Sequence, residues 1–435
     1  MLLIKRVSAA HVLCTCKSLL RRTIYDTLCA MYLSRLALIN FRNYARLSLD
    51  MPRRIMVLQG ANAQGKTNVL EAIYYLTAAK SPYAGSDTQL VNWLAEQDDL
   101  PHARVEAELI RSNTLTRIEI TLTRDERNHG RYRKHIRING VDKRVMDLIG
   151  VANIVLFMPQ DISLVDGSPL GRRHYLDATL CQIDPRYCRA LAQYGRVLEQ
   201  RNGLLRQLRD RGGSPEQLHF WNDRLVEHGA QIIARRQQVI LDLEALAQTI
   251  HRDLSGGRER LRLRYSPSFD PQHPQEDDQQ LRLGLDLPPP ISMPQDPETI
   301  QEAFCVRLQS TQSEEIARGM TLSGPHRDDM LFLNGQIDLR TYGSRGQQRT
   351  AVLAIKLAEV GLMGRITGEQ PILLLDEVMS ELDASRRQYL SQQIAQAEQS
   401  LVTTTDLDAL TPDVLKLAAV YSVSQGRLER IGLQG

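Results

Sequence analysis

Apolar and polar residues alternate over two stretches in the first third of the chain, which is the pattern of antiparallel strands with one buried face. Residues 33–49 predict a hairpin, and residues 104–140 predict further strands with a turn at Asn139-Gly140. Residues 55–58 carry no polar position and therefore predict a strand buried on both faces. After them, residues 67–79 place apolar side chains at the spacing of a helix.

The middle of the chain has a longer, helical period. Apolar residues recur every three or four positions from Leu191 to Leu208, like the seam of a coiled coil, with one interruption at Arg201. Residues 212–217 break this helix, and Ser214 followed by Pro215 suits the start of another. Because a second periodic run continues to residue 250, we expect two long antiparallel helices that form an arm.

Composition narrows the class of protein only slightly. The chain has 435 residues and a net charge of +3, so overall charge is weak evidence for a nucleic-acid partner. No window approaches the roughly 18 apolar residues of a membrane span. Cys14 and Cys16 have no second pair that would complete a zinc site. We therefore expect a reduced, cytoplasmic protein without a membrane partner.

Two segments of the chain have an unusual composition. Residues 266–298 are rich in proline, glutamine and acid and predict a loop or disorder. Residues 1–30 are basic, with no acidic residue before Asp26, so they resemble either an organelle presequence or an extension from an upstream start codon. We expect the second alternative, with the protein proper beginning at Met31.

The clearest chemistry lies in the loop between the buried strand and its helix. Its sequence, GANAQGKT, fits the phosphate-binding loop pattern in full, and a chance glycine turn is not expected between such flanking elements. Glycines let several backbone N–H groups point into one concavity, lysine reaches the β- and γ-phosphates of ATP, and threonine ligates Mg²⁺. The predicted loop comprises Gly60, Ala61, Asn62, Ala63, Gln64, Gly65, Lys66 and Thr67.

A phosphate-binding loop needs an acid on a neighbouring strand. After four apolar residues, Asp376 is placed to hold Mg²⁺ through water and Glu377 to polarise the attacking water. Two adjacent acids are equally typical of a strand end that faces solvent. Their occurrence together with a phosphate-binding loop favours a nucleotide-binding site. Gln160 follows another apolar strand and could reach the metal and the water, or be an ordinary loop residue.

A second glycine turn, at residues 343–347, precedes the helical run 351–360. A glycine turn at a helix N-terminus is a good seat for an anion. Since the first loop leaves the γ-phosphate facing outward, the second turn can bind the nucleotide held by another copy of the chain. In that arrangement Ser344 and the backbone of Gly346 cap the γ-phosphate across a dimer interface.

The order of these motifs resembles that of ABC-type ATPases. More closely, the chain resembles the RecF family of DNA replication and repair proteins from Met31 to about Arg430. The resemblance rests on LSRLALINFRNY, NVLEAIYYL, DGSPLGRRHYLD, LSGPHRDD, GSRGQQRTAVLAIKLAE and LLLDEVMSELD. It implies an α/β fold, in which an ABC-type ATPase head with mixed sheets and helices occupies residues 31–165 and 299–435. An α-helical arm with a coiled-coil-like helix pair is inserted at residues 166–298.

The resemblance also assigns roles to residues. Gly60 to Thr67 match the Walker A loop, Gln160 the glutamine loop, and Asp376 with Glu377 the Walker B pair. Ser344, Gly346 and Gln347 match the signature, although Arg345 replaces the second-position glycine of transporters. Asp383 matches the D-loop, which runs along the dimer interface. Thr405 stands where transporters place a histidine, and we take this as a sign of slow turnover.

The function implied is that of an ATP-controlled DNA-binding protein in recombinational repair, replication and the response to DNA damage. Two subunits close around two ATP molecules, bind double-stranded DNA near single-strand junctions, and with RecO and RecR help to load RecA. A weak, DNA-stimulated ATPase then resets the complex. The role of His326 and Arg327 in LSGPHRDD does not follow from the family.

Support for DNA from the residues themselves is modest. Phosphate contacts need arginine or lysine, and arginine is dense between residues 172 and 264. Such side chains are also typical of a solvated helix face or of internal ion pairs. The candidates on or near the arm are Arg172, Arg173, Arg196, Arg201 and Arg206.

Three rival functions fit less well. A transporter ATPase would carry a Leu-Ser-Gly-Gly signature and lack the inserted arm. A nuclease with an ABC-like ATPase would need a second acidic metal cluster, and a cohesion protein would need coiled coils of hundreds of residues.

Overall fold

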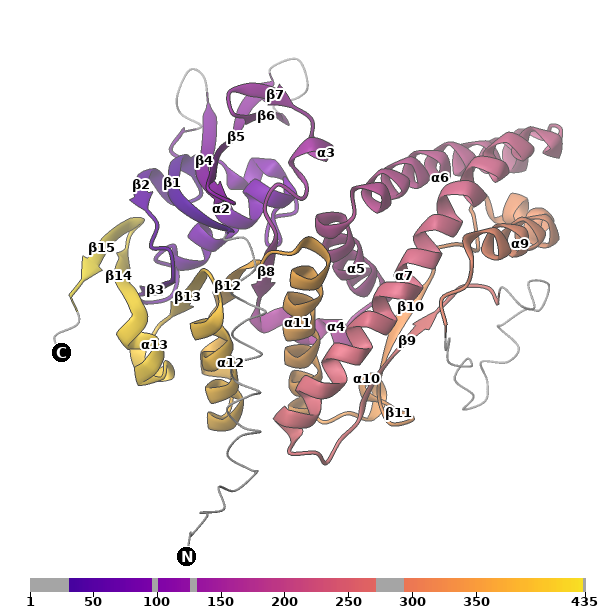
Figure 1. The fold of residues 1–435 in the computed structure, drawn as a ribbon. Coiled ribbons are helices and arrows are strands. Elements are labelled where there is room, and N and C mark those ends of the chain that lie inside the picture. Colours follow the sequence, from indigo (N-terminus) through magenta and orange to yellow (C-terminus); the bar gives the residue numbers. More distant parts are fainter. Residues whose placement is uncertain (1–30, 96–100, 126–130, 271–292, 433–435) are drawn as a thin grey trace, which may run out of the picture.

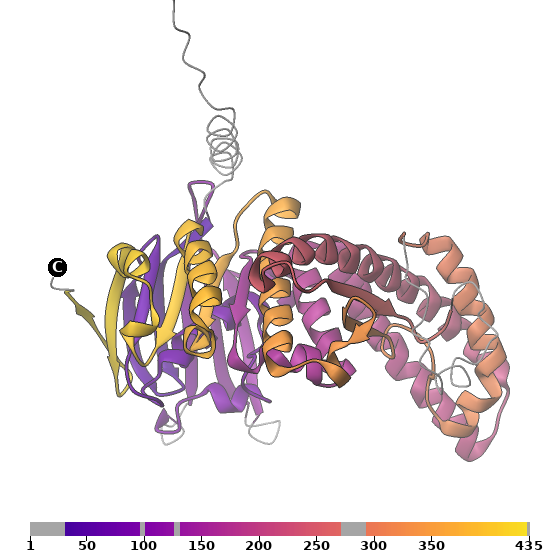
Figure 2. The same cartoon turned by 90° about the horizontal axis from the view of Figure 1, so that it is seen from below.

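A computed structural model describes residues 31–95, 101–125, 131–270 and 293–432. The predictions for residues 1–30 and for most of the Pro/Gln-rich stretch lie outside these ranges. The described chain forms a head with two six-stranded sheets, a small three-stranded sheet, and a pair of long helices that project from the head (Figures 1 and 2).

The first sheet of the head is antiparallel and has the order β2-β1-β4-β5-β6-β7. The predicted hairpin is confirmed, because Leu36 pairs with Leu49 across its two strands. The predicted turn at Asn139-Gly140 is confirmed as well, and both residues have positive φ. The strands are β1 (Met31–Phe41), β2 (Tyr44–Asp50), β4 (His102–Arg111), β5 (Thr114–Asp125), β6 (Arg131–Ile138) and β7 (Val141–Lys143).

The second sheet is mixed, with five parallel strands and one antiparallel edge strand, in the order β15-β14-β3-β13-β12-β8. The apolar run at residues 55–58 lies in its interior, as predicted, and is fully buried. Parallel strands present their carboxyl ends at one edge, where ligands bind in such sheets. The strands are β3 (Ile55–Gln59), β8 (Ile154–Phe157), β12 (Ile372–Asp376), β13 (Ser400–Thr404), β14 (Ala418–Ser424) and β15 (Arg427–Ile431).

The core has two layers, one on each face of the mixed sheet. Helix α2 (Lys66–Ala78) lies between the two sheets, since its residues Val69 and Ile73 share one apolar cluster with both. On the opposite face, Val57 and Leu375 belong to a second cluster with α5 (Pro169–Ile183) and α11 (Arg345–Thr367). The shorter helices α12 (Ala384–Gln396) and α13 (Pro412–Leu417) follow β12 and β13.

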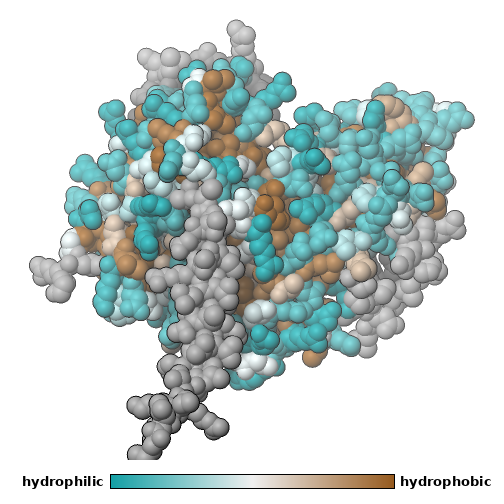
Figure 3. Space-filling view, in the orientation of Figure 1, coloured by the Kyte–Doolittle hydropathy of each residue, from teal (hydrophilic) through white to brown (hydrophobic). Residues whose placement is uncertain are grey.

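The arm consists of α6 (Pro185–Arg211) and α7 (Leu218–Ser255), the predicted antiparallel pair. Its visible surface is mostly hydrophilic (Figure 3). Helix α9 (Pro297–Arg318), which the predicted boundary at 298 assigned to the head, packs on both arm helices. The packing of α9 on α7 is close at Gly229, where an added Cβ would lie 2.7 Å from the Phe304 ring of α9.

The small sheet links the arm to the helix that follows the second glycine turn. It has the order β11-β10-β9, with β9 (Leu261–Ser266), β10 (Asp329–Asn334) and β11 (Ile337–Asp338). The chain then passes through α10 (Leu339–Tyr342) into α11. Residues 343–347 therefore lie beside this sheet and the base of the arm.

Candidate nucleotide-binding site

The loop between β3 and α2 is shaped by two glycines for different reasons. A Cβ on Gly60 would lie 2.4 Å from the Val423 carbonyl oxygen, so only glycine lets β14 come this close. Gly65, the N-cap of α2, has φ 113°, a conformation that favours glycine. The backbone of Gln64 is fixed by the Asn43 side chain, whose Nδ2 donates to its carbonyl at 2.9 Å. The curl of the loop is thus held between β14 and the turn that joins β1 to β2.

The Lys66 side chain binds the backbone of the phosphate-binding loop. Its side chain is 4% exposed, and Nζ donates to the carbonyl oxygens of Gly60 (2.7 Å) and Ala61 (3.0 Å). Nζ also forms an ion pair with Glu377, whose Oε1 lies 2.8 Å away. The lysine of the first predicted motif and the acid of the second, 311 positions apart in the numbering, are therefore in direct contact.

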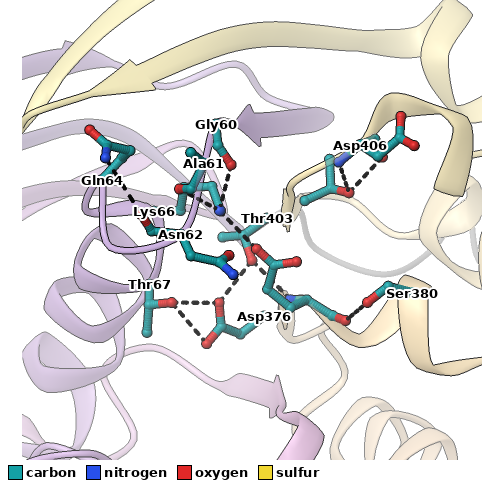
Figure 4. Close-up of polar contacts among 12 residues, drawn as sticks. Gly60, Ala61, Asn62, Gln64, Lys66, Thr67, Asp376, Ser380, Thr403 and Asp406 are labelled. Atoms are coloured by element: carbon teal, nitrogen blue, oxygen red, sulfur yellow. Dashed lines mark hydrogen bonds and ion pairs between the residues drawn. The ribbon is translucent and has the colours of Figure 1, made fainter.

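Asp376 receives hydroxyl donors from three different elements. Thr67 Oγ1 lies 2.9 and 3.1 Å from its two carboxylate oxygens, Thr403 Oγ1 lies 2.8 Å from Oδ1, and the Tyr83 hydroxyl lies 2.8 Å from Oδ2. Burial and the neighbouring Asp376 raise the pKa of Tyr83, so its hydroxyl stays a donor. The side chain that the sequence assigns to the metal is thus held at the end of β12 (Figure 4).

Glu377 has a backbone conformation that costs energy. Its φ is 55° and its ψ 13°, in the left-handed region, where a residue other than glycine is uncommon. Two hydrogen bonds hold it there: its N–H donates to Thr403 Oγ1 at 2.9 Å, and its carbonyl accepts from Ser380 Oγ at 2.7 Å. Strain of this kind gathers at functional sites. Here it aims the Glu377 carboxylate at the phosphate-binding loop.

The residues fit a magnesium ion carried in by a nucleotide. Thr67 and Asp376 offer adjacent hard oxygen donors, which Mg²⁺ prefers, and one or two such ligands suffice when phosphates and water supply the rest. Across the described residues, no group of three or more His, Cys, Asp or Glu side chains could hold a metal. A metal here would therefore depend on the phosphates for its remaining ligands.

Gln160 is not drawn into this cluster. It lies in a 3₁₀ turn, η4 (Pro159–Ile162), after β8, where its side chain is exposed and its Nε2 donates to Met158 Sδ at 3.2 Å. Its neighbour Asp161 is buried, and burial raises the pKa of Asp161 to about 6. The turn follows β8, the strand next to β12, so the predicted element is in place while its glutamine contacts none of the residues above.

The second glycine turn caps α11 and faces solvent. Ser344 Oγ accepts from the Gln347 N–H at 3.2 Å, and Gln347 Oε1 accepts from the Ser344 N–H at 2.9 Å, a reciprocal capping box. Ser344 and Gly346 are exposed, and Arg345 forms an ion pair with Asp166. Within the described ranges, no hydrogen bond or ion pair joins residues 344–347 to residues 60–67. The two predicted phosphate seats of one chain are thus separate.

Asp383 sits at another exposed helix N-terminus. It is the N-cap of α12 and accepts from the Arg386 N–H at 3.0 Å. That hydrogen bond is the largest cause of a lowered pKa of Asp383, so its carboxylate is charged at neutral pH. Thr405, at the position of the transporters' histidine, is exposed just beyond β13.

Comparison with known proteins identifies the family. A family model described as the RecF/RecN/SMC N terminal domain matches residues 32–429. The DNA replication and repair protein RecF of Chloroflexus aurantiacus is 40% identical over 409 residues, which cover 92% of this chain and 99% of that protein. RecF of Bacillus subtilis is 36% identical over 400 residues, with 92% and 100% coverage. The chain belongs to the RecF family.

Solved RecF structures share the fold. One, described as the recombination mediator protein RecF with ATP in the RecFOR pathway, is 29% identical, with a TM-score of 0.80 and coverage of 93% of this chain and 99% of that chain. Another, with ATPrS, has a TM-score of 0.79 at 29% identity and covers 93% and 100%. The predicted fold class, an ABC-type head with an inserted helical arm, is confirmed. None of the helices described here is long and apolar enough to cross a membrane.

Two of the five arginines predicted to contact DNA are buried in this chain, which contradicts that role. Arg172 is 2% exposed and forms a bidentate pair with Asp329, and Arg201 is 0% exposed and pairs with Glu315. Arg173 is half-buried and donates to the Asp328 carbonyl. Arg196 and Arg206 are exposed on α6 and stay candidates.

The LSGPHRDD segment, whose role the family resemblance left open, contacts both arm helices and α5. Tyr194 of α6 lies 2.7 Å from His326 Nδ1, and Arg236 of α7 donates to the Pro325 carbonyl at 2.6 Å. Arg172 of α5 holds Asp329, the first residue of β10, at 2.6 and 2.8 Å. Burial lowers the pKa of His326 to about 4, so its ring is neutral and serves as a hydrogen-bond partner.

Sequence reasoning missed Tyr83, Thr403 and Asn43, which complete the site. Asn43 lies in the quoted stretch INFRNY and could have been suspected as a contact of the phosphate-binding loop. Thr403 lies at the end of a buried strand, as Asp376 does, and this shared position was the available signal. Tyr83 lies in an irregular loop after α2 and carries no pattern that would have pointed to it.

Proposed function

We propose that this RecF-family chain is an ATP-dependent switch that dimerises around two ATP molecules and binds double-stranded DNA near single-strand gaps. Slow hydrolysis, stimulated by DNA, releases it. The relatives named as DNA replication and repair proteins and the solved RecF structures with ATP and ATPrS support ATP as the ligand. The solved RecF structures, which are described as part of the RecFOR pathway, support a role with RecO and RecR in loading RecA.

Each residue of the site has a role in this proposal. Lys66 exchanges its loop carbonyls for the β- and γ-phosphates, and the backbone of residues 60–67 surrounds the phosphates. Thr67 and Asp376 would hold Mg²⁺, which would supply positive charge beside the phosphates. Glu377, already aimed at the loop and 24% exposed, accepts a proton from the attacking water.

One observation carries the proposal: the signature is built, exposed and separate from the phosphate-binding loop of its own chain. A helix N-terminus with exposed Ser344 and Gly346 offers N–H groups and a partial positive charge. Because these groups make no hydrogen bond with the chain's own phosphate-binding loop, we propose that a second copy brings its loop to them. Asp383, exposed at the start of α12, belongs to the same contact in our proposal.

DNA contact rests on arginines that solvent reaches. Arg196 and Arg206 lie on the outer surface of α6, and phosphate contacts of this kind position a duplex without reading its sequence. Thr405 in place of a histidine supports slow turnover, since threonine cannot act as a charged relay. A fast steady-state ATPase rate in the absence of DNA would contradict this part of the proposal.

The decisive experiment is the molecular mass in solution, by light scattering, with and without ATP and duplex DNA. We expect a monomer without nucleotide and a dimer with ATP. Ser344→Arg should bind ATP as the wild type does yet remain a monomer, because the larger cation blocks the seat offered to the partner. Loss of ATP binding in Ser344→Arg would mean that the signature acts within its own chain, and a dimer unaffected by ATP would refute the switch.

A further inference from the structure

Thr403 contacts both acids of the nucleotide site through one hydroxyl group. It is fully buried near the end of β13, and in the parallel register it lies opposite Asp376 of β12. Its Oγ1 is 2.8 Å from Asp376 Oδ1 and 2.9 Å from the Glu377 backbone nitrogen. No other described side chain bonds to both residues. The Thr403 hydroxyl is therefore a junction between the metal-holding acid and the acid aimed at the loop.

The direction of each hydrogen bond is fixed by the chemistry of the partners. An ionised carboxylate only accepts and a backbone N–H only donates, so the Thr403 hydroxyl donates to Asp376 and accepts from Glu377. A hydroxyl has one proton, which leaves it no freedom to rotate without losing the Asp376 bond. The left-handed conformation of Glu377, which costs energy, is held on its N–H side by this same hydroxyl.

We propose that Thr403 is a positioning residue that sets Asp376 for the metal and Glu377 for the attacking water together. The proposal rests on the proposed function, since it concerns the same site. Tyr83 supports Asp376 from the other carboxylate oxygen but makes no contact with Glu377. Thr67, the third donor, is the side chain expected to turn to the metal. A displacement of Asp376 would therefore be passed to Glu377 through the Thr403 hydroxyl.

The neighbouring strand residue provides a matched control. Thr404 is also buried, but its hydroxyl donates to the Asp406 carbonyl at 2.7 Å, outside the acid pair. Thr403→Val and Thr404→Val thus make the same chemical change one residue apart on one strand. Thr403→Ser keeps the hydroxyl and removes only a methyl group. Tyr83→Phe removes one donor to Asp376 and leaves the Glu377 backbone alone.

The test measures binding and chemistry separately. A fluorescent ATP analogue, titrated with Mg²⁺, reports the Mg²⁺ concentration at half-saturation, and single-turnover hydrolysis reports the chemical step. Loss of an outer contact to a metal-holding residue typically costs 10–100-fold. For Thr403→Val we therefore expect metal-free analogue binding within about threefold of wild type, half-saturation about tenfold or more higher, and hydrolysis at saturating Mg²⁺ about tenfold or more slower.

The control variants decide the interpretation. Thr403→Ser and Thr404→Val should stay within about threefold of wild type in both measurements, and Tyr83→Phe should raise the half-saturating Mg²⁺ but recover most of its hydrolysis when the metal saturates. Wild-type values in Thr403→Val, or equal losses in Thr403→Ser or Thr404→Val, would overturn the proposal. Should Thr403→Val not fold, Thr403→Ala makes the same comparison. A wild-type protein that does not bind the analogue would refute the proposed function, a result distinct from all of these.

Discussion

Replacing Arg201 by methionine separates the two roles that this residue could have. The guanidinium is fully buried and donates to Asn222 Oδ1 (2.8 Å), Thr321 Oγ1 (2.7 Å) and Glu315 Oε2 (2.6 Å). Glu315 is fully buried too, and burial already raises the pKa of Glu315 above its usual value with Arg201 beside it. Methionine fills much of the space but leaves the Leu322 N–H as the hydrogen-bond donor to the Glu315 carboxylate.

The expected loss of stability in Arg201→Met comes from the Glu315 carboxyl, which is left without its partner. Removing one partner of a buried ion pair typically destabilises a protein by about 3–5 kcal/mol, because the other charge must stay unpaired or take up a proton. The double variant Arg201→Met/Glu315→Leu removes both charges, so we expect it to recover most of the loss. Arg206→Met, on the exposed face of the same helix, is the control and should change stability by less than about 0.5 kcal/mol.

Urea unfolding followed by circular dichroism measures these differences, and DNA binding at several salt concentrations measures the alternative role. Arg206→Met should reduce the salt dependence by about one phosphate contact if Arg206 touches DNA. Arg201→Met, at a temperature where it is folded, should not change it. An Arg201→Met protein as stable as the wild type but weaker on DNA would refute the interpretation of Arg201 as a structural residue.

Three further predictions concern the site and the arm. Lys66→Ala should lose ATP binding and ATP-dependent dimerisation, as measured by equilibrium binding of a labelled nucleotide. Nucleotide binding as tight as that of the wild type would mean that Lys66 does not contact the phosphates. Glu377→Gln should bind ATP and accumulate as a dimer on DNA, with turnover at least about 100-fold lower, as a lost general base implies; unchanged phosphate release would remove Glu377 from that role. Because the pKa of His326 falls from 6.5 to about 4 on folding, the unfolded chain takes up this proton first, and stability is lost as the pH falls through that window. Relative to His326→Gln, the wild type should lose up to about 3 kcal/mol between pH 7 and pH 4, and parallel urea curves for the two would contradict this.

The nucleotide site was largely predictable because its motifs are local. A strand, a glycine turn and a helix are adjacent in sequence, so the loop at residues 60–67 could be placed from pattern alone, and an apolar strand ending in Asp376 pointed to the same sheet edge. Tyr83 and Thr403 could not be placed this way. Their roles depend on which strands are neighbours, and strand order is a property of the whole fold.

The arginines show a second limit of sequence reasoning. The break in the leucine pattern at Arg201 marked a charged residue on the buried side of α6, yet positive charge alone suggested DNA. Its partners, Glu315 and Thr321, lie more than 100 positions away, so the pattern of α6 could not show that the charge was compensated. Helix α9 was assigned to the head for the same reason, since it is far in sequence from the arm helices on which it packs.

The buried ion pair in the seam of the arm also limits how the arm can move. An all-leucine seam can slip along its partner by a turn with little loss, whereas a slip here would strand Arg201 and Glu315 in an apolar interface. Helix α6, with 27 residues and thus a length of about 40 Å, therefore keeps a fixed register against the helices that it packs on. A movement of α6 that keeps this ion pair must therefore tilt the helix rather than shift it along its axis.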